Sequence, residues 1–354
     1  MTEPLAPGST IGILGGGQLG RMLAVAAARL GLHCHIFEPG PAPPAAEVAR
    51  DLTTAAYDDA QALRRFGESV DVITYEFENV PAEALDLLEG CAPIRPGRAA
   101  LAVSQDRLEE KTYLAGLGLA VAPHAPVDSL EDLEAARERL GPGILKTRRM
   151  GYDGKGQVRL GPSDPSFPAI EALQGAPAIY EAMVPFDCEI SVIAARGIAG
   201  ETVCFDPGQN LHRDGILHQT RVPAAVSKSV AQDAVFAAAR ILSALEYVGV
   251  LGVEIFVAGS KVIVNEIAPR VHNSGHWTIE ACVIDQFQQH IRAIAGWPLG
   301  DGTRHSNALM TNLIGEEADA WHELAKSGGL HLYGKAEARP GRKMGHLTRL
   351  TPKE

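Results

Sequence analysis

The chain has 354 residues, of which 46% are hydrophobic and 21% are charged. This length and composition predict two or three domains with buried cores and argue against disorder. The formal net charge of −11 and the aromatic content of 5% argue against the broad basic, base-stacking surface of a nucleic-acid-binding protein, so no nucleic-acid partner is expected.

Cysteine usage and apolar patterning indicate the compartment. The five cysteines are widely spaced and include no CxxC pair, which excludes a disulfide framework and is typical of a reducing environment. The sequence has no apolar run of about 18 residues and no signal-peptide pattern at its N-terminus. We therefore predict a cytoplasmic protein with no membrane partner.

The first hundred residues alternate between strand-like and helical patterns. Alternation of this kind predicts a Rossmann-like α/β domain with a parallel sheet, which we place at residues 1–103. Strands are predicted at 10–14, 33–37 and 70–75, and helices at 21–30, 58–66 and 82–88.

The rest of the chain mixes helices with short strands and hairpins. Ser104 is a candidate cap for the first of these helices. Helices are predicted at 104–117, 130–140 and 229–245, and strands at 143–147, 157–160, 178–181, 189–195, 253–257 and 261–267. We expect a linker helix and a small lid subdomain at 104–180, and a C-terminal α+β domain with a small C-terminal subdomain at 181–354.

A glycine-rich turn, Gly15-x-Gly17-x-x-Gly20, lies between the first strand and the first helix. With Glu38 at the end of the next strand, it matches a dinucleotide site in which the acid meets a ribose hydroxyl. The same turn serves any ligand that needs amides at a helix N-terminus, and it also serves plain strand–helix packing. An NAD-dependent oxidoreductase therefore stays open as an alternative.

A second glycine-rich segment, Gly151-Tyr-Asp-Gly-Lys-Gly156, follows a strand that carries Lys146 near its end. Three glycines in six residues allow the backbone to close over phosphates, and Lys155 adds a positive charge. The segment lies between strands and lacks the Walker pattern, so it predicts a hairpin flap over a nucleotide. A plain glycine-rich hairpin is the alternative.

Two glutamates in apolar strands form the sharpest pattern. Glu254 and Glu266 flank a predicted hairpin turn, and pairing of Ala258 with Val262 would place the two glutamates directly opposite each other. Facing carboxylates repel, so one pKa should rise unless a cation lies between them. Hard oxygen ligands at this spacing suit Mg²⁺ that also binds phosphates. The alternative is one Glu paired with a cation and the other solvated.

The segment after this hairpin contains further polar residues. His272 and His276 have the i, i+4 spacing of a zinc site, but Gly275 lies between them and no acidic ligand is evident. We favour anion-binding and hydrogen-bonding roles for Arg270, Asn273 and His276. By itself, His212 fits a loop histidine without function.

Taken together, these segments resemble the ATP-grasp ligases, and most closely the N5-carboxyaminoimidazole ribonucleotide synthases of purine biosynthesis. One departure is Met150, where the family pattern leads us to expect glycine. The matching segments are GGGQLGRML (15–23), TYEFENV (74–80), GYDGKGQ (151–157), NLHRDGIL (210–217), NEIAPRVHNSGHW (265–277) and RPGRKMGHL (339–347).

The resemblance implies an ATP-grasp fold and assigns residues to ATP and to Mg²⁺. Within the ATP set, Glu181 and Val184 meet the adenine and Glu189 meets a ribose hydroxyl. Glu254 and Glu266 hold the metal. The ATP set comprises Arg107, Lys146, Gly151, Tyr152, Asp153, Gly154, Lys155, Gly156, Gln157, Glu181, Ala182, Met183, Val184, Glu189, His212, Asn265 and Glu266.

The resemblance also implies carboxylation of 5-aminoimidazole ribonucleotide with bicarbonate and ATP, through carboxyphosphate, in a homodimer. Asp153 is the candidate for orienting or deprotonating the amine. The other implied catalytic residues are Tyr152, Arg270 and His272, and the implied substrate contacts are Gly17, Gln18, Leu19, Glu76, Asn79, Asn273, Lys335 and Arg342. The glycine turn at Gly15 becomes a substrate-side phosphate loop.

Three other functions stay open. A related ATP-grasp ligase could activate formate or another carboxylate on a different purine precursor. An NAD-dependent oxidoreductase rests only on the glycine turn and Glu38. A nucleotide sensor without catalysis would be expected to lack the paired metal carboxylates, and both are present.

Overall fold

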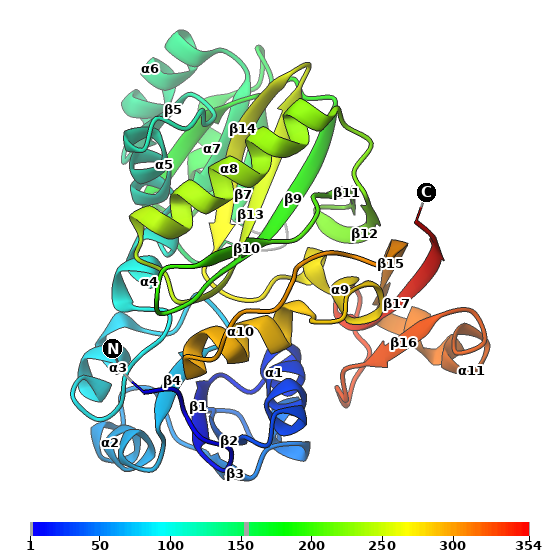
Figure 1. The fold of residues 1–354 in the computed structure, drawn as a ribbon. Coiled ribbons are helices and arrows are strands. Elements are labelled where there is room, and N and C mark those ends of the chain that lie inside the picture. The colour runs from blue at the N-terminus through cyan, green and yellow to red at the C-terminus, as the bar shows by residue number, and fades with distance from the viewer. Residues whose placement is uncertain (1–2, 152–155, 354) are drawn as a thin grey trace.

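The N-terminal segment alternates apolar strands with helices, and its strands form a four-stranded parallel sheet (Figure 1). The computed structural model describes residues 3–151 and 156–353. The sheet has the order β3-β2-β1-β4, and every pairing in it is parallel, as the alternation predicted. Its elements are β1 (Thr10–Leu14), α1 (Gln18–Arg29), β2 (His33–Phe37), η1 (Pro44–Glu47), β3 (Asp51–Thr53), α2 (Ala60–Glu68), β4 (Val72–Tyr75) and α3 (Ala82–Leu88).

Two helices, not one, follow this domain. They are α4 (Arg98–Ser104) and α5 (Arg107–Gly116). The Asp106 carboxylate accepts the N–H groups of Leu108 at 3.0 Å and Glu109 at 3.4 Å, so it caps α5. The predicted single helix with Ser104 as its cap is therefore wrong. A carboxylate at Asp106 satisfies the free amides and favours a new helix start there.

A small antiparallel sheet forms the predicted lid region, in the order β5-β8-β6-β7. Leu133, Ala136, Leu145 and Tyr180 are buried in its own core. Its elements are β5 (His124–Val127), α6 (Leu130–Leu140), β6 (Gly143–Thr147), β7 (Gln157–Leu160), α7 (Ser166–Ala172) and β8 (Ala178–Ala182).

A nine-stranded sheet carries the rest of the chain, in the order β14-β13-β9-β11-β12-β15-β17-β16, with β10 paired to β9. Its strands are β9 (Cys188–Arg196), β10 (Thr202–Cys204), β11 (Gly208–Arg213), β12 (Ile216–Val222), β13 (Gly249–Ala258), β14 (Lys261–Ala268), β15 (Ser306–Ile314), β16 (Gly329–Leu332) and β17 (Lys343–Pro352). The helical elements between them are α8 (Lys228–Ala244), η2 (Asn273–Gly275), α9 (Thr278–Ala281), α10 (Gln286–Ala295), η3 (Gly315–Ala320) and α11 (Trp321–Leu324).

Period-two alternation along β9 builds cores on both faces of this sheet. Val192 and Ala194 join the core that includes α8, whereas Ile193 and Ala195 join the core shared by α10, α1 and β1. Figure 1 shows α10 between the large sheet and the N-terminal domain. This shared core fixes the N-terminal domain against the sheet that carries the paired glutamates.

No helix among the described residues is long and apolar enough to cross a membrane. The five cysteines are free thiols. The domain boundaries at 103/104 and 180/181 stay predictions, although the lid core draws only on residues after 120.

Substitution of Gly143 tests the packing of the lid. An added Cβ at Gly143 would lie 2.6 Å from the Tyr180 ring and would collide with the backbone oxygen of Glu181. We expect Gly143→Ala to lower the free energy of unfolding by about 1–3 kcal/mol, as overpacking does. Denaturant unfolding measures this change.

The matched control is Gly116→Ala in α5, where nothing lies within 4 Å of the added Cβ. Alanine there should raise stability by roughly 0.5–1 kcal/mol, because glycine is the weaker helix former. Equal effects of the two substitutions would contradict the packing argument.

Candidate active site

The two predicted metal carboxylates face each other across the β13–β14 hairpin. Glu254 pairs directly with Glu266, as predicted. The predicted register at the turn is wrong by one residue, because Ala258 pairs with Lys261 and not with Val262. A β-bulge next to Glu254 compensates for this shift and leaves Asn265 as the extra residue on β14. The bulge therefore brings the two carboxylates back into register.

Neighbouring cations keep Glu266 ionised. Arg107 Nη1 lies 2.9 Å from Glu266 Oε2. Burial would raise the pKa of Glu266, but Arg107, Lys146 and Lys111 outweigh burial and lower it to about 2. The raised pKa belongs instead to Glu110, where burial and the charge of Glu266 raise it to about 8. The cations therefore offset the repulsion between Glu254 and Glu266, and the carboxyl group whose pKa rises is that of Glu110.

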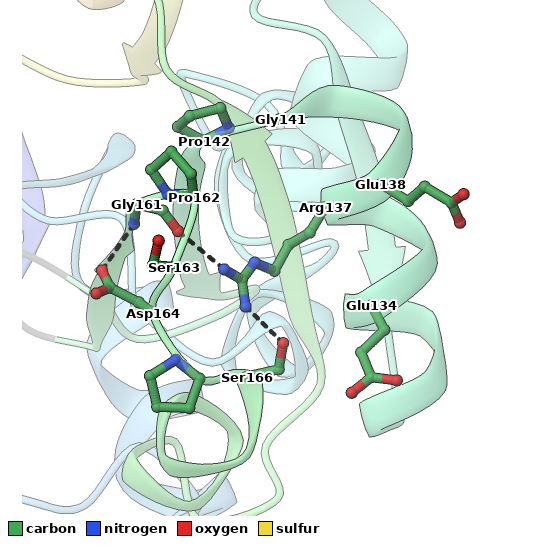
Figure 2. Close-up of a pocket in the computed structure, with 11 residues that line it drawn as sticks. Glu134, Arg137, Glu138, Gly141, Pro142, Gly161, Pro162, Ser163, Asp164 and Ser166 are labelled. Carbon is green, nitrogen blue, oxygen red and sulfur yellow. Dashed lines mark hydrogen bonds between the residues drawn. The ribbon is translucent and has the colours of Figure 1, made fainter.

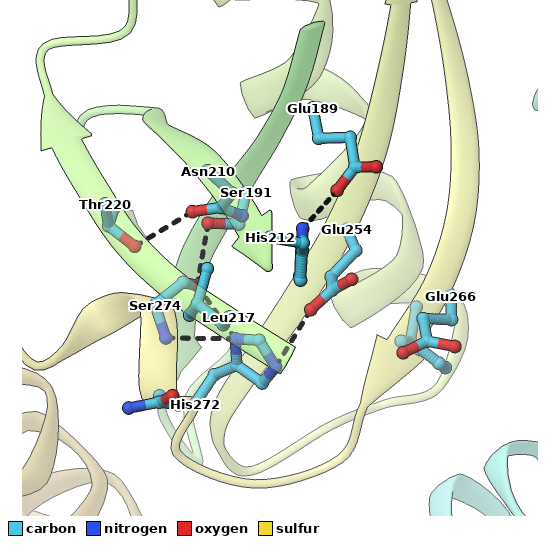
Figure 3. Close-up of polar contacts among 12 residues, drawn as sticks. Glu189, Ser191, Asn210, His212, Leu217, Thr220, Glu254, Glu266, His272 and Ser274 are labelled. Atoms are coloured by element: carbon cyan, nitrogen blue, oxygen red, sulfur yellow. Dashed lines mark hydrogen bonds and ion pairs between the residues drawn. The ribbon is translucent and has the colours of Figure 1, made fainter. Parts of the chain in front are cut away.

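Two histidines hold the other carboxylates at this site (Figure 3). His272 Nε2 lies 3.2 Å from Glu254 Oε1, and His212 Nδ1 lies 2.6 Å from Glu189 Oε2. Burial alone would lower the pKa of His212, but the hydrogen bond and charge of Glu189 raise it. Predicted residues from β9, β11, β13 and the segment after β14 therefore meet in one place.

Ser274 fixes the orientation of the His272 ring. Its Oγ lies 2.8 Å from His272 Nδ1, and Ser191 Oγ donates to Ser274 Oγ at 2.7 Å. The backbone N–H of Ser274 also points to Nδ1, at 3.4 Å. With donors on Nδ1, the ring proton belongs on Nε2, which faces Glu254. The sequence reasoning missed both serines, since Ser191 is distant in sequence.

The lid contributes a second set of buried charges. Lys146 Nζ donates to Glu181 Oε2 at 2.9 Å, and Lys111 Nζ lies 3.6 Å from the same oxygen. Burial would raise the pKa of Glu181, but these two lysines lower it. Glu181 Oε1 is buried and has no hydrogen-bond partner among the described residues. This carboxylate oxygen can accept a hydrogen bond from a bound ligand.

Arg107 joins the lid to the hairpin. One guanidinium nitrogen donates to Glu266, and the other donates to the backbone oxygen of Gly151 at 2.9 Å. The predicted ATP residues therefore form two bonded groups, which are Arg107 with Gly151 and Glu266, and Lys146 with Glu181. Lys146 links the groups electrostatically, because it also lowers the pKa of Glu266.

The segment after β8 offers an apolar surface beside these charges. Met183 and Phe186 are exposed, and Phe186 stacks on Phe256 of β13 with ring centroids 4.6 Å apart. Ala182 and Val184 are half-buried. Phe256 is two residues from Glu254, so strand alternation places both on one face of β13, a signal that the sequence reasoning did not use.

The predicted flap is only partly described. Tyr152, Asp153, Gly154 and Lys155 lie outside the described residues, so their predicted roles stay predictions. Gly156 and Gln157 are exposed. Met150 has φ = +64°, a left-handed conformation that favours glycine. The position where the family pattern led us to expect glycine therefore retains a glycine-like backbone.

Carboxylates occupy the amides of the N-terminal glycine turn. The buried Glu76 carboxylate accepts the N–H groups of Gly17 and of Gly20, the latter at 2.7 Å. Glu38 accepts the backbone N–H groups of Gly16 at 2.9 Å and of Gly40 at 3.0 Å, so each of its two oxygens already has a donor that is not a ribose hydroxyl. This geometry opposes the NAD alternative.

The same contacts argue against the expected phosphate-binding role of this turn. A phosphate would have to displace Glu76 from the turn and would be repelled by Glu38, so phosphate binding by these amides is not supported. Direct contact of Gly17, Gln18, Leu19 or Glu76 with another part of a ligand stays a prediction.

Arg270 lies between the N-terminal domain and the hairpin. It forms an ion pair with Glu78, which the sequence reasoning missed although Glu78 is in the quoted segment 74–80. Burial would raise the pKa of Glu78, but Arg270 lowers it. Asn79 is half-buried, and no further contact defines its role.

Two polar residues after the hairpin are held internally. Asn273 and Asn312 exchange two amide hydrogen bonds, of 2.9 and 2.8 Å. His276 is 1% exposed and lies 3.0 Å from Gln286, so it has the expected hydrogen-bonding role, in the core, and its burial argues against anion binding. Substrate contact by Asn273 stays a prediction.

The two predicted phosphate-binding cations lie in the C-terminal subdomain. Lys335 Nζ donates to the backbone oxygen of Lys343 at 2.7 Å, and Arg342 Nη1 donates to that of Glu337 at 3.0 Å. Both side chains are half-buried. A shared anion between them stays a prediction.

A separate pocket of about 550 Å³ lies on the lid between α6 and the loop 161–166 (Figure 2). Arg137 spans it, donating to Ser166 at 2.6 Å and to the Gly161 backbone at 2.8 Å. None of the predicted site residues lines this pocket. Since the guanidinium of Arg137 is already hydrogen-bonded to Ser166 and Gly161, we do not assign this pocket to the active site.

The donor set fits a magnesium ion that is bound partly by a ligand. Among the described residues, no group of three or more His, Cys, Asp or Glu side chains can hold a metal unaided. Two facing carboxylates are the typical protein share of a Mg²⁺ site completed by phosphates and water. Glu254 and Glu266 meet that description.

Comparisons with known proteins cover almost the whole chain. Three family models match: the ribonucleotide synthetase preATP-grasp domain at residues 8–105, the ATP-grasp domain at 112–287 and the phosphoribosylaminoimidazole carboxylase C-terminal domain at 308–354. An N5-carboxyaminoimidazole ribonucleotide synthase from Brucella melitensis is 54% identical over 99% of this chain and 98% of its own. Its Bacillus subtilis counterpart is 41% identical over 97% of this chain and 91% of its own.

Solved structures agree. An ADP complex of an N5-carboxyaminoimidazole ribonucleotide synthetase superposes with a TM-score of 0.96 at 42% identity, covering 99% of this chain and 94% of that one. The Aspergillus clavatus synthase with ADP and 5-aminoimidazole ribonucleotide gives 0.92 at 31% identity, covering 98% and 94%. The fold, the paired carboxylates and these relatives together show that this chain belongs to the N5-carboxyaminoimidazole ribonucleotide synthase family of ATP-grasp enzymes.

Proposed function

We propose that the protein is an ATP-dependent ligase that carboxylates 5-aminoimidazole ribonucleotide with bicarbonate in purine biosynthesis. The observation that carries this proposal is the facing pair Glu254–Glu266, with Arg107 beside Glu266 and the Lys146–Glu181 pair of the lid close by. The family supplies the substrate class, because its relatives include complexes with ADP, ATP and the ribonucleotide.

ATP would lie between the lid and the large sheet. The free Glu181 Oε1 supports adenine recognition, since an adenine amino group is a hydrogen-bond donor. The Phe186–Phe256 stack and Met183 supply apolar surface for the base. Glu189, held by His212, is placed for a ribose hydroxyl, and Lys146 and Arg107 carry the positive charge that polyphosphate needs.

Magnesium would be held by Glu254 and Glu266, with Asn265 beside them. Bound there, it would neutralise charge on the phosphates and keep them in position for transfer. His272 keeps Glu254 oriented, and Arg107 keeps Glu266 ionised.

The proposed chemistry must activate bicarbonate, which is a poor electrophile. Bicarbonate has an electron-rich carbon and a bad leaving group. Transfer of the γ-phosphoryl group to a bicarbonate oxygen releases ADP and gives carboxyphosphate, whose leaving group is phosphate. The exocyclic amine of the ribonucleotide then attacks the carboxyl carbon, phosphate leaves and the amine loses a proton. Such transfer depends mainly on positioning and charge neutralisation, which buried cations provide.

A closing flap would protect carboxyphosphate from water. The flap residues Tyr152 and Asp153 would meet the ribonucleotide, with Asp153 orienting or deprotonating the amine. Arg270 would face the same substrate, while Lys335 and Arg342 would take its 5′-phosphate. The Glu78–Arg270 pair supports this placement because it joins the N-terminal domain to the hairpin.

We further propose a cytoplasmic homodimer. Free thiols and the purine substrate support the compartment. Sedimentation measures the oligomeric state. The second candidate function is a related ATP-grasp ligase that activates formate or another carboxylate on a different purine precursor. It would share the ATP contacts, so assays with bicarbonate and formate distinguish the two.

The central test is ADP release with each substrate omitted in turn. We expect Mg²⁺-dependent turnover that requires both bicarbonate and 5-aminoimidazole ribonucleotide, because carboxyphosphate should form productively only in the closed complex. A coupled ADP assay measures this. Equal turnover without the ribonucleotide would contradict the substrate assignment, and stimulation by formate in place of bicarbonate would favour the second candidate.

Glu266→Gln tests the metal role. We expect turnover to fall by about 100-fold or more at ordinary Mg²⁺ concentration, since a neutral amide is a poor ligand for a hard cation. The variant should also lose some stability, because Glu266 is ionised beside Arg107 and the substitution breaks this partly buried ion pair. Steady-state kinetics over a Mg²⁺ series, with denaturant unfolding, separates these effects. Near-normal activity would remove Glu266 from the metal site.

Arg342→Ala and Lys335→Ala test the phosphate assignment. Loss of a charge-assisted hydrogen bond costs about 1.5–3 kcal/mol, or roughly 10- to 150-fold in affinity. We expect the KM for the ribonucleotide to rise by that factor, with the KM for ATP nearly unchanged. Steady-state measurement of both constants in each variant is the test. An effect confined to ATP would place these residues elsewhere.

A further inference from the structure

The strand that carries Glu266 lies at the edge of the large sheet. In the described ranges, β14 pairs with β13 on one side, and on the other it makes only an isolated bridge between Val121 and Val264. The backbone oxygen of Asn265 and the N–H of Ile267, one on each side of Glu266, therefore lack a strand partner. Unpaired backbone groups in a buried setting are costly and must be satisfied otherwise.

Helix α5 satisfies both groups with side chains. Lys111 Nζ donates to the Asn265 backbone oxygen, and Glu110 Oε1 accepts the Ile267 N–H at 2.8 Å. The two side chains are deeply buried, with Glu110 3% and Lys111 1% exposed. Arg107, three and four residues earlier on the same helix face, donates to the Glu266 carboxylate itself. One face of α5 thus takes the place of a missing strand around Glu266.

We propose that Glu110 and Lys111 are positioning residues that hold the bulged edge of β14, so that Glu266 faces Glu254. This inference rests on the proposed metal role of Glu266. A bulge interrupts the hydrogen-bond ladder at Asn265, and a one-residue slip would turn Glu266 to the opposite face. Contacts that clamp both flanks of Glu266 from the open side oppose that slip.

The two residues differ in a way that selects the cleaner test. Lys111 also lies 3.6 Å from Glu181, so its loss would disturb the adenine side as well. Among the described residues, the Glu110 side chain makes no hydrogen bond or ion pair with the lid, and it accepts one hydrogen bond, from the Ile267 N–H. We therefore test Glu110, with Glu110→Met removing the acceptor and Glu110→Gln retaining an oxygen in its place.

Hydrogen exchange of the Ile267 amide and the Mg²⁺ dependence of turnover are measured together. In the unaltered protein the Ile267 amide should exchange slowly despite its position on an edge strand. Glu110→Met should speed its exchange and raise the Mg²⁺ midpoint about tenfold or more, as loss of outer contacts to a metal ligand does. Glu110→Gln should restore both, and the KM for the ribonucleotide should stay unchanged.

The matched control is Glu109→Met, at the neighbouring position on α5. The Glu109 side chain is 65% exposed and lies 3.8 Å from Arg148, away from β14. This variant should leave the exchange rate and the Mg²⁺ midpoint as they are. If Glu110→Met does not fold, Glu110→Asp repeats the test, because it withdraws the carboxylate by one methylene and should shift both readouts in the same direction.

The outcomes separate this inference from the proposed function. A Mg²⁺ midpoint that shifts in Glu266→Gln but not in folded Glu110→Met would overturn the positioning role alone. A midpoint unchanged in Glu266→Gln would overturn the metal role and this inference with it. Rapid exchange of Ile267 in the unaltered protein would show that Glu110 does not hold the strand edge.

Discussion

Two carboxylates on adjacent strands repel each other, and this protein keeps them together by placing cations beside Glu266 and a histidine beside Glu254. Arg107, Lys111 and Lys146 all act on Glu266, and they outweigh the burial that would otherwise protonate it. Two of these cations come from α5 and the third from the lid strand β6. The placement of α5 and β6 beside the hairpin is therefore an electrostatic requirement of Glu266 as much as a result of packing.

The same charges connect the lid to α5 and to the β13–β14 hairpin. Glu181 of the lid is neutralised by Lys146 from its own sheet and by Lys111 from α5. Arg107 likewise bonds both to Glu266 and to the backbone of Gly151 at the start of the flap. A polyphosphate entering between them would compete for these cations. ATP binding would then exchange internal ion pairs for ligand contacts, which limits the desolvation cost of binding.

Local patterns in the sequence predicted much of this arrangement, and distant contacts account for what they missed. Alternation along the first hundred residues predicted the parallel sheet, and apolar strands around a short turn predicted the facing glutamates. The local pattern did not predict the bulge at Asn265, where the backbone bonds to side chains on α5 that are more than 150 positions away. Glu78 escaped notice for a similar reason, since its partner Arg270 is 192 positions distant.

The N-terminal glycine turn illustrates why a local motif does not identify a ligand. Its backbone has the form that dinucleotide enzymes use, with Gly15 at φ = +98° and a helix starting at Gln18. What decides its function is the partner of each amide. Here Glu76, which follows the neighbouring strand β4, and Glu38 accept hydrogen bonds from three of those amides. A ligand phosphate would therefore meet two carboxylates instead of a free helix terminus. The amides of the turn therefore hold the two carboxylates in place, and these amides are not free for a phosphate.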